Sequence, residues 1–198
     1  MTGFAPMPPL HTLGFHFSKW DVVSSDIMRE RNQNFTDYDF PVDVLVMDIQ
    51  WADDQSKFDG YEYFRFNPQN FTTDGISSMN QEIEEAGRYM TVILDPHIKV
   101  SDEYFVYSQG QELQAQSTSE NVNNIFVKSK TGDSDFTGVC WPGLSSWIDF
   151  LNENAQAFWS GLYDYSKFIG SSSIYHAWND MNEPSVFSTT SRTVPKTA

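Results

Sequence analysis

Four apolar runs recur along the chain, separated by polar or helix-like stretches. They are Leu13–Phe17, Val42–Ile49, Tyr89–Leu94 and Ile174–Trp178. The second and third runs are almost continuously apolar and rich in Val, Ile and Leu. Such runs are typical of parallel strands, which are covered on both faces. We therefore predict four strands in a parallel sheet.

Three stretches between these runs predict helices. They are Ser24–Tyr38, Ser77–Gly87 and a segment within Ser145–Phe168. In the first, Ser24 or Ser25 can cap the N-terminus and Asp26 falls in the first turn, while Gly87 ends the second. The third has apolar positions roughly along one stripe, namely Phe150, Leu151, Phe158, Leu162 and Tyr165. Strands that alternate with helices indicate an α/β fold.

One connection departs from this alternation. Ser108–Asn124 is rich in Gln, Ser and Asn, which predicts a loop or a poorly ordered insertion. Long loops in βα proteins usually lie at the carboxyl ends of the strands, on the functional face. We find no internal repeat and no linker to a second domain.

Composition narrows the classes of function. The chain has 27 acidic against 12 basic residues, a net charge of −15, which argues against nucleic acid and anionic membrane surfaces as partners. Aromatic residues make up 16% of the chain, a composition that suits sugar binding and equally suits a large aromatic core. No run approaches the roughly 18 apolar residues of a membrane helix.

Cysteine usage and the N-terminus bear on compartment. A single cysteine, Cys140, excludes an intrachain disulfide and a cysteine-based metal site. The first residues lack a signal-peptide pattern, so we expect a cytosolic protein or a piece of a longer one. Glycosylation sequons at Asn34 and Asn70 mildly favour a secretory origin.

Acidic side chains follow three of the predicted strands. Asp48, Asp95 and Asp180 come at or just after the ends of the second, third and fourth runs. A single acid at such a place is most often a helix cap or a loop anchor. Because the carboxyl ends of parallel strands converge, three acids at equivalent places predict a common acidic pocket.

Clustered carboxylates serve either metals or sugars. Asp95 and His97 form the one pair with ligand-like spacing, and the proline between them restricts it, so we do not expect a metal. Sugar hydrolysis needs two carboxylates and is often accompanied by aromatic walls. Trp20, Trp51 and Trp141 can supply such walls, although each can equally belong to the core.

The decapeptide Trp178-Asn-Asp-Met-Asn-Glu-Pro-Ser-Val-Phe187 resembles the nucleophile signature of glycoside hydrolase family 31. Further blocks resemble the family's first three strands and the loop before its fourth. They are Leu13–His16 with Trp20, Asp43–Ile49, Asp95–Lys99 and Cys140–Gly143. Five blocks in the family's order make the resemblance specific, and it spans nearly the whole chain.

The resemblance implies a role for individual residues. Asp180 matches the catalytic nucleophile and Asp48 the acid that binds hydroxyls of the terminal glucose. Four further positions match residues of the sugar pocket: Asp95, Trp141, Ile49 and Met181. Glu183 matches a structural position, and the family's acid/base residue is expected after Ala198. Gln50 and Phe17–Lys19 depart from the usual pattern, which leaves the preference beyond the first sugar open.

The implied fold is a (β/α)8 TIM barrel, of which residues 1–198 cover about the first half, strands one to four. Residues 101–135 would form a divergent insertion between strands three and four. The implied activity is a retaining α-glucosidase without metal or cofactor, which trims glucose from N-glycans in the endoplasmic reticulum lumen with a regulatory β subunit. Alternatives are a lysosomal or digestive α-glucosidase and a non-catalytic sugar-binding relative. We expect the chain alone to be inactive.

Overall fold

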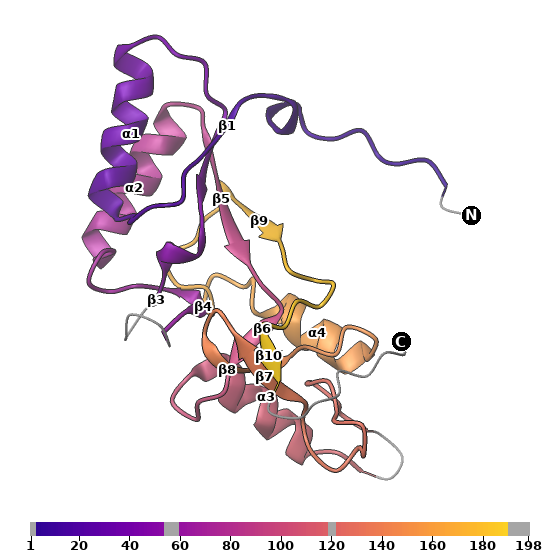
Figure 1. Cartoon of the computed structure of the whole chain (residues 1–198). Coiled ribbons are helices and arrows are strands. Elements are labelled where there is room, and N and C mark those ends of the chain that lie inside the picture. Colours follow the sequence, from indigo (N-terminus) through magenta and orange to yellow (C-terminus); the bar gives the residue numbers. More distant parts are fainter. Residues whose placement is uncertain (1–2, 54–59, 119–121, 190–198) are drawn as a thin grey trace. The chain divides into compact units, whose positions relative to one another are not determined.

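The computed structural model describes residues 3–53, 60–118 and 122–189 (Figure 1). Within it the chain forms two compact units, and neither is continuous in sequence. The first unit comprises Met1–Trp51, Pro68–Ile93 and Gly170–Trp178, and the second comprises Ala52–Asn67, Leu94–Ile169 and Asn179–Ala198. The sequence shows no linker between them because the chain crosses from one unit to the other five times.

The first unit is organised around a four-stranded sheet. Its strand order is β1 (His16–Ser18), β2 (Val44–Met47), β5 (Tyr89–Leu94) and β9 (Tyr175–Asn179). β1 and β2 are parallel, as are β2 and β5, and all four residues of β2 are buried. The parallel sheet predicted from the apolar runs is confirmed, and β5 occupies the predicted residues.

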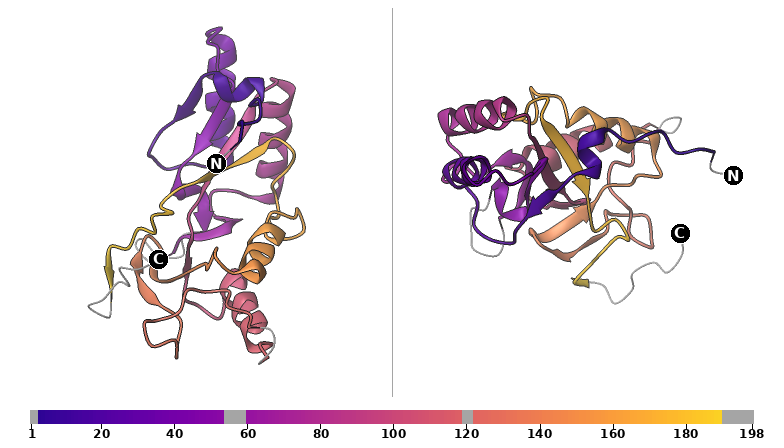
Figure 2. Two further views of the ribbon diagram at one scale, coloured as in Figure 1. Left: turned by 90° about the vertical axis from the view of Figure 1, so that its right-hand side faces the viewer. Right: turned by 90° about the horizontal axis from the view of Figure 1, so that it is seen from above.

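Helices α1 (Ser25–Asp37) and α2 (Thr73–Glu85) pack against each other in the first unit, and two further views show them side by side (Figure 2). The Ser24 hydroxyl accepts the Ile27 amide, so the predicted cap of α1 is confirmed. Arg29 Nε donates to Glu82 at 3.0 Å across the helix pair.

The second predicted helix ends where the sequence predicts, but it begins earlier than predicted. α2 begins at Thr73, four positions before the predicted Ser77, because the Thr72 hydroxyl accepts the Gly75 amide at 3.1 Å. That cap outweighs the low helix propensity of Gly75. At the other end Gly87 has φ +69°, and the amide of Arg88 donates to the Ile83 carbonyl, as in a Schellman motif.

The strand predicted over Leu13–Phe17 is wrong in its first part. The residues Leu10–Leu13 form a 3-10 helix, and β1 covers only His16–Ser18. Both the amide and the hydroxyl of Thr12 donate to the Pro9 carbonyl, so a local turn takes the bonds that a strand would need.

The second unit contains a mixed set of short strands and two helices. One antiparallel sheet has the order β10 (Ser188–Thr189), β7 (Thr137–Cys140), β8 (Gly143–Trp147) and β6 (His97–Lys99). A two-stranded sheet pairs β3 (Ala52–Asp53) with β4 (Glu62–Phe66). The helices are α3 (Phe105–Ala115) and α4 (Glu153–Gly161).

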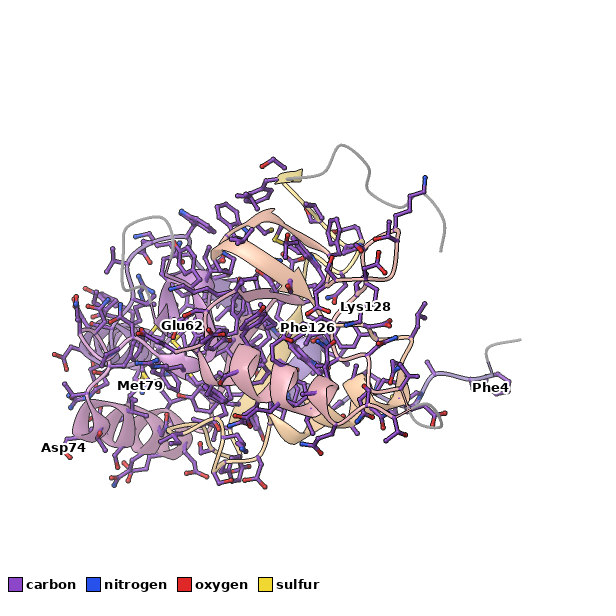
Figure 3. All side chains as sticks on the ribbon, turned by 90° about the horizontal axis from the view of Figure 1, so that it is seen from below. Phe4, Glu62, Asp74, Met79, Phe126 and Lys128 are labelled. Carbon is purple, nitrogen blue, oxygen red and sulfur yellow. The ribbon has the colours of Figure 1, made fainter. Side chains whose placement is uncertain are left out.

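The loop predicted over Ser108–Asn124 is wrong in its first half, where α3 lies. The amide side chain of Gln114 explains why a polar sequence is ordered there. Its Oε1 accepts the Ile125 and Phe126 amides and the Lys128 ammonium at 3.0–3.1 Å. Figure 3 shows Phe126 and Lys128 beside this helix. The polar side chains therefore supply the hydrogen bonds that hold the segment.

The third predicted helix lies within Ser145–Phe168 as expected, and it is α4. Residues from Ser145 to Trp147 belong to β8, and α4 starts after Asn152, whose side chain accepts the Asn154 amide. The predicted apolar stripe is wrong in part, because Leu151 and Tyr165 lie outside α4 and are 87% and 60% exposed.

In the described part of the chain no helix is long and apolar enough to cross a membrane.

Candidate active site

The three predicted acids follow neighbouring strands of the sheet in the first unit. Asp48 comes directly after β2, Asp95 directly after β5, and Asp180 directly after β9. Asp48 belongs to the first unit, whereas Asp95 and Asp180 belong to the second. Their surroundings are accordingly described unit by unit.

In the first unit, Asp48 begins a tight turn. Its Oδ1 accepts the Ile49 amide at 2.8 Å, and its carbonyl accepts the Trp51 amide. Trp51 is fully buried and donates through Nε1 to the Ile93 carbonyl at 3.1 Å. Trp51 therefore belongs to the core and forms no sugar wall. Ile49 is also buried, while Trp20 is 57% exposed.

A hollow of about 420 Å³ opens on one face of this sheet. Each of the four strands contributes a side chain to its lining: His16, Val46, Thr91 and Trp178. Alternate strand residues share a face, so these neighbours follow from the strand register. In the sequence, His16 stood out only as part of the Leu13–His16 block of the family resemblance.

In the second unit, the segment after Asp180 makes a tight turn. Met181 has φ +58°, and its carbonyl accepts the Ser185 amide at 3.1 Å. The Asn182 side chain donates to the Asp180 carbonyl. The Asp180 carboxylate itself has no hydrogen bond or ion pair with another described residue.

Hydrogen bonds join this turn to the end of β7. Trp141 Nε1 donates to Met181 Sδ at 3.0 Å, which joins two of the four residues that the family resemblance matched to the sugar pocket. The Phe187 amide donates to the Val139 carbonyl, and Cys140 Sγ donates to the Ser185 carbonyl.

Asp95 is the centre of a buried polar cluster in the second unit. Tyr63 donates its hydroxyl proton to Asp95 Oδ2 at 2.6 Å, and His97 Nε2 lies 3.2 Å from both oxygen atoms. All three residues have 0% exposure. Burial first, and then the charge of Asp95, raise the pKa of Tyr63 well above its usual value, so the phenol stays a donor.

Sequence reasoning missed Tyr63. Its strand, β4, is short and lies outside the apolar runs, and 32 positions separate Tyr63 from Asp95. The clue in the sequence was three aromatic residues within the five residues of β4, which is a weak signal in so short a strand. His97 was noted only as half of an unfavoured metal pair, and among the described residues no His, Cys, Asp or Glu group forms a metal-binding cluster.

Comparison with known proteins identifies the class. The chain belongs to glycoside hydrolase family 31, because the pattern described as "Glycosyl hydrolases family 31 TIM-barrel domain" matches residues 5–198. The resemblance and the α/β barrel class inferred from the sequence are thereby confirmed, and the described residues form part of that barrel domain.

Within the family, the chain is similar in sequence to neutral alpha-glucosidases. Neutral alpha-glucosidase C of Mus musculus is 36% identical over 198 residues, all of this chain and 20% of the relative. Neutral alpha-glucosidase AB of Sus scrofa is 37% identical over 187 residues, 94% of this chain and 18% of the relative. The chain thus spans about a fifth of the length of these relatives.

Solved structures agree with this placement. The chain resembles a structure of the ER glucosidase II heterodimeric complex of catalytic subunit and the binding domain of regulatory subunit, with TM-score 0.81 and 34% identity. That match covers 94% of this chain and 18% of the other. A family 31 alpha-glucosidase from Bacteroides thetaiotaomicron gives TM-score 0.72 and 29% identity over 96% of this chain and 29% of the other.

Proposed function

We propose that the protein containing these residues is a retaining α-glucosidase that removes terminal α-linked glucose, with Asp180 as the nucleophile. The observation that carries the proposal is the place of Asp180. It follows a strand of the barrel sheet directly, and its carboxylate is unbonded within the described residues. The α-glucosidase names of the relatives support the same activity.

In the proposed reaction, the Asp180 carboxylate attacks the anomeric carbon as the glycosidic C–O bond breaks, forming a glucosyl ester. A second carboxylic acid gives its proton to the leaving oxygen. The same group then takes a proton from water, which attacks the anomeric carbon, breaks the ester and releases α-glucose. In retaining enzymes these two carboxyl groups lie about 5–5.5 Å apart. We expect this acid/base residue to lie beyond Met1–Ala198.

The substrate-binding residues are proposed from the family resemblance. Asp48 would bind sugar hydroxyls, and Trp141 and Met181 would contact the ring. Ile49, which is buried, would support the apolar side of the pocket from behind. The Trp141–Met181 hydrogen bond supports a shared wall. For Asp95 we propose a place behind the sugar, since its carboxylate is fully buried.

We further propose that the substrate is a glucosylated N-glycan in the endoplasmic reticulum lumen and that a regulatory subunit assists. The likeness to the catalytic subunit of a glucosidase II heterodimer supports this choice over a lysosomal or digestive α-glucosidase. Proteomic localisation of the full-length protein and capture of a second subunit would test it.

Replacing the nucleophile tests the proposed activity. Asp180→Asn in the full-length protein should lower kcat by about 10³-fold or more, because the ester can no longer form. The control is Asp133→Asn, which makes the same change at an exposed acid and should leave kcat unaltered. Proton NMR should detect α-glucose as the first product. Undiminished activity of Asp180→Asn would reject its role, and initial β-glucose would reject retention.

A further inference from the structure

The buried cluster of Tyr63, Asp95 and His97 has no part in the steps above, although it lies in the same unit as Asp180. Its three members come from β4, from the residue after β5, and from β6. A carboxylate with 0% exposure is costly to bury unless donors satisfy it. The cluster is therefore held by its hydrogen bonds, and each donor matters.

The donors around Asp95 can be assigned from geometry. An ionised carboxylate only accepts, so the Tyr63 hydroxyl donates to Oδ2 at 2.6 Å. His97 Nε2 faces two oxygen atoms, which assigns its proton to Nε2. Asp95 Oδ1 has no partner among the described residues, so Oδ2 receives both hydrogen bonds. Loss of the Tyr63 hydroxyl would leave Asp95 Oδ2 with a single hydrogen bond.

A chain of contacts leads from this cluster to the turn after Asp180. His97 is the register partner of Trp147, and their ring centroids are 6.1 Å apart. Trp147 forms a buried core with Phe136 and Cys140, against which Trp141 and Met181 pack. The charge of Asp95 also contributes to raising the pKa of the Cys140 thiol.

We propose that Tyr63 is a positioning residue, an inference that rests on the proposed function. The Tyr63 hydroxyl fixes the side chains of Asp95 and His97. Through them it holds Met181 and Trp141 beside the nucleophile. Tyr63 does not touch the sugar. Replacing Tyr63 should therefore lower kcat, because the segment that Tyr63 positions carries Asp180.

A second buried tyrosine gives a matched control. Tyr104 is also 0% exposed and donates its hydroxyl to the Tyr63 carbonyl at 2.7 Å. Tyr104→Phe therefore removes a buried phenol hydrogen bond in the same unit, and among the described residues this hydroxyl has no hydrogen bond with Asp95 or His97. A general loss of packing or stability would affect both variants alike, whereas positioning through Asp95 affects only Tyr63→Phe.

The experiment compares Tyr63→Phe, Tyr104→Phe, Asp95→Asn and the Tyr63→Phe/Asp95→Asn double variant in the full-length protein. Tyr63→Phe should lower kcat about tenfold, the effect of one hydrogen bond to a charged group, with KM changed less than about twofold. Tyr104→Phe should keep kcat within about twofold of the wild-type value, although its melting temperature should fall about as much as that of Tyr63→Phe. The double variant should match Asp95→Asn, because Tyr63 acts through Asp95.

Three results would overturn the proposal. A rise in KM at constant kcat would place Asp95 in contact with the sugar, and equal losses of kcat in the two tyrosine variants would make the hydroxyl merely structural. A readout independent of activity is the methyl resonance of Met181. It should shift in Tyr63→Phe and not in Tyr104→Phe, and an unchanged resonance would also reject the proposal. A wild-type protein without α-glucosidase activity would reject the proposed function alone, and the methyl resonance would still decide this inference.

Discussion

Cys140 illustrates how surroundings set the chemistry of a residue. Its side chain belongs to a buried core with Phe136 and Trp147 and is 4% exposed. Burial, with a smaller contribution from the charge of Asp95, raises the pKa of the thiol from 9.0 to about 11, against the lowering effect of a backbone hydrogen bond with Trp141. Thiolate is the reactive form, so this cysteine should be inert in the folded chain.

Alkylation kinetics test that expectation. At pH 8 a thiol with a pKa of about 11 holds about 100-fold less thiolate than one with a pKa of 9.0. Labelling of native protein with iodoacetamide, followed by mass spectrometry, should therefore be at least about 100-fold slower than labelling in urea. Similar rates in the two conditions would show that Cys140 is accessible and that its pKa is not raised.

Helix α3 is the element whose order was least expected from its composition. Gly110 lies in this helix opposite the 125–126 segment, and a Cβ at Gly110 would come within 2.7 Å of the Phe126 ring. The close approach of α3 to this segment therefore requires glycine at a position where helix propensity alone favours alanine.

Gly110→Ala should destabilise the fold by about 1–3 kcal/mol, since overpacking outweighs the gain in helix propensity. Gly161→Ala is the matched control in α4, where an added Cβ meets nothing within 4 Å. That change should be neutral or stabilise by up to about 1 kcal/mol. Urea unfolding of both variants makes the comparison, and equal effects would contradict the packing of α3 on Phe126.

Elements were predictable where local signals were strong. β5 was found because its apolar run is nearly unbroken, and α1 because Ser24 is a good cap. The strands β6, β7 and β8 were missed because they are short and lack an alternating apolar pattern. Ser145 and Ser146 of β8 are buried although they are polar, and β6 pairs with β8 across a long stretch of sequence. Similarly, Asp95 was found as a strand-end acid, but its partner Tyr63 was not.

At the scale of the whole molecule, the proposed mechanism needs two carboxylic acids, and the roles assigned here account for one. The purified 198-residue chain should therefore release no glucose from an α-glucoside under conditions in which the full-length protein does. A coupled glucose assay on both proteins makes the measurement. Release by the 198-residue chain would contradict the expectation and make Glu183 or Asp48 the candidate acid.

The sequence alone determined the parallel strands, the cap of α1 and the identity of Asp180 as a strand-end acid. These features depend on neighbours within a few positions or on a continuous motif. Only the tertiary structure decided that Tyr63 meets Asp95 and that Trp141 donates to Met181, pairs that are 32 and 40 positions apart. Such contacts depend on the path of the chain through two interleaved units, and no local pattern of residues records that path.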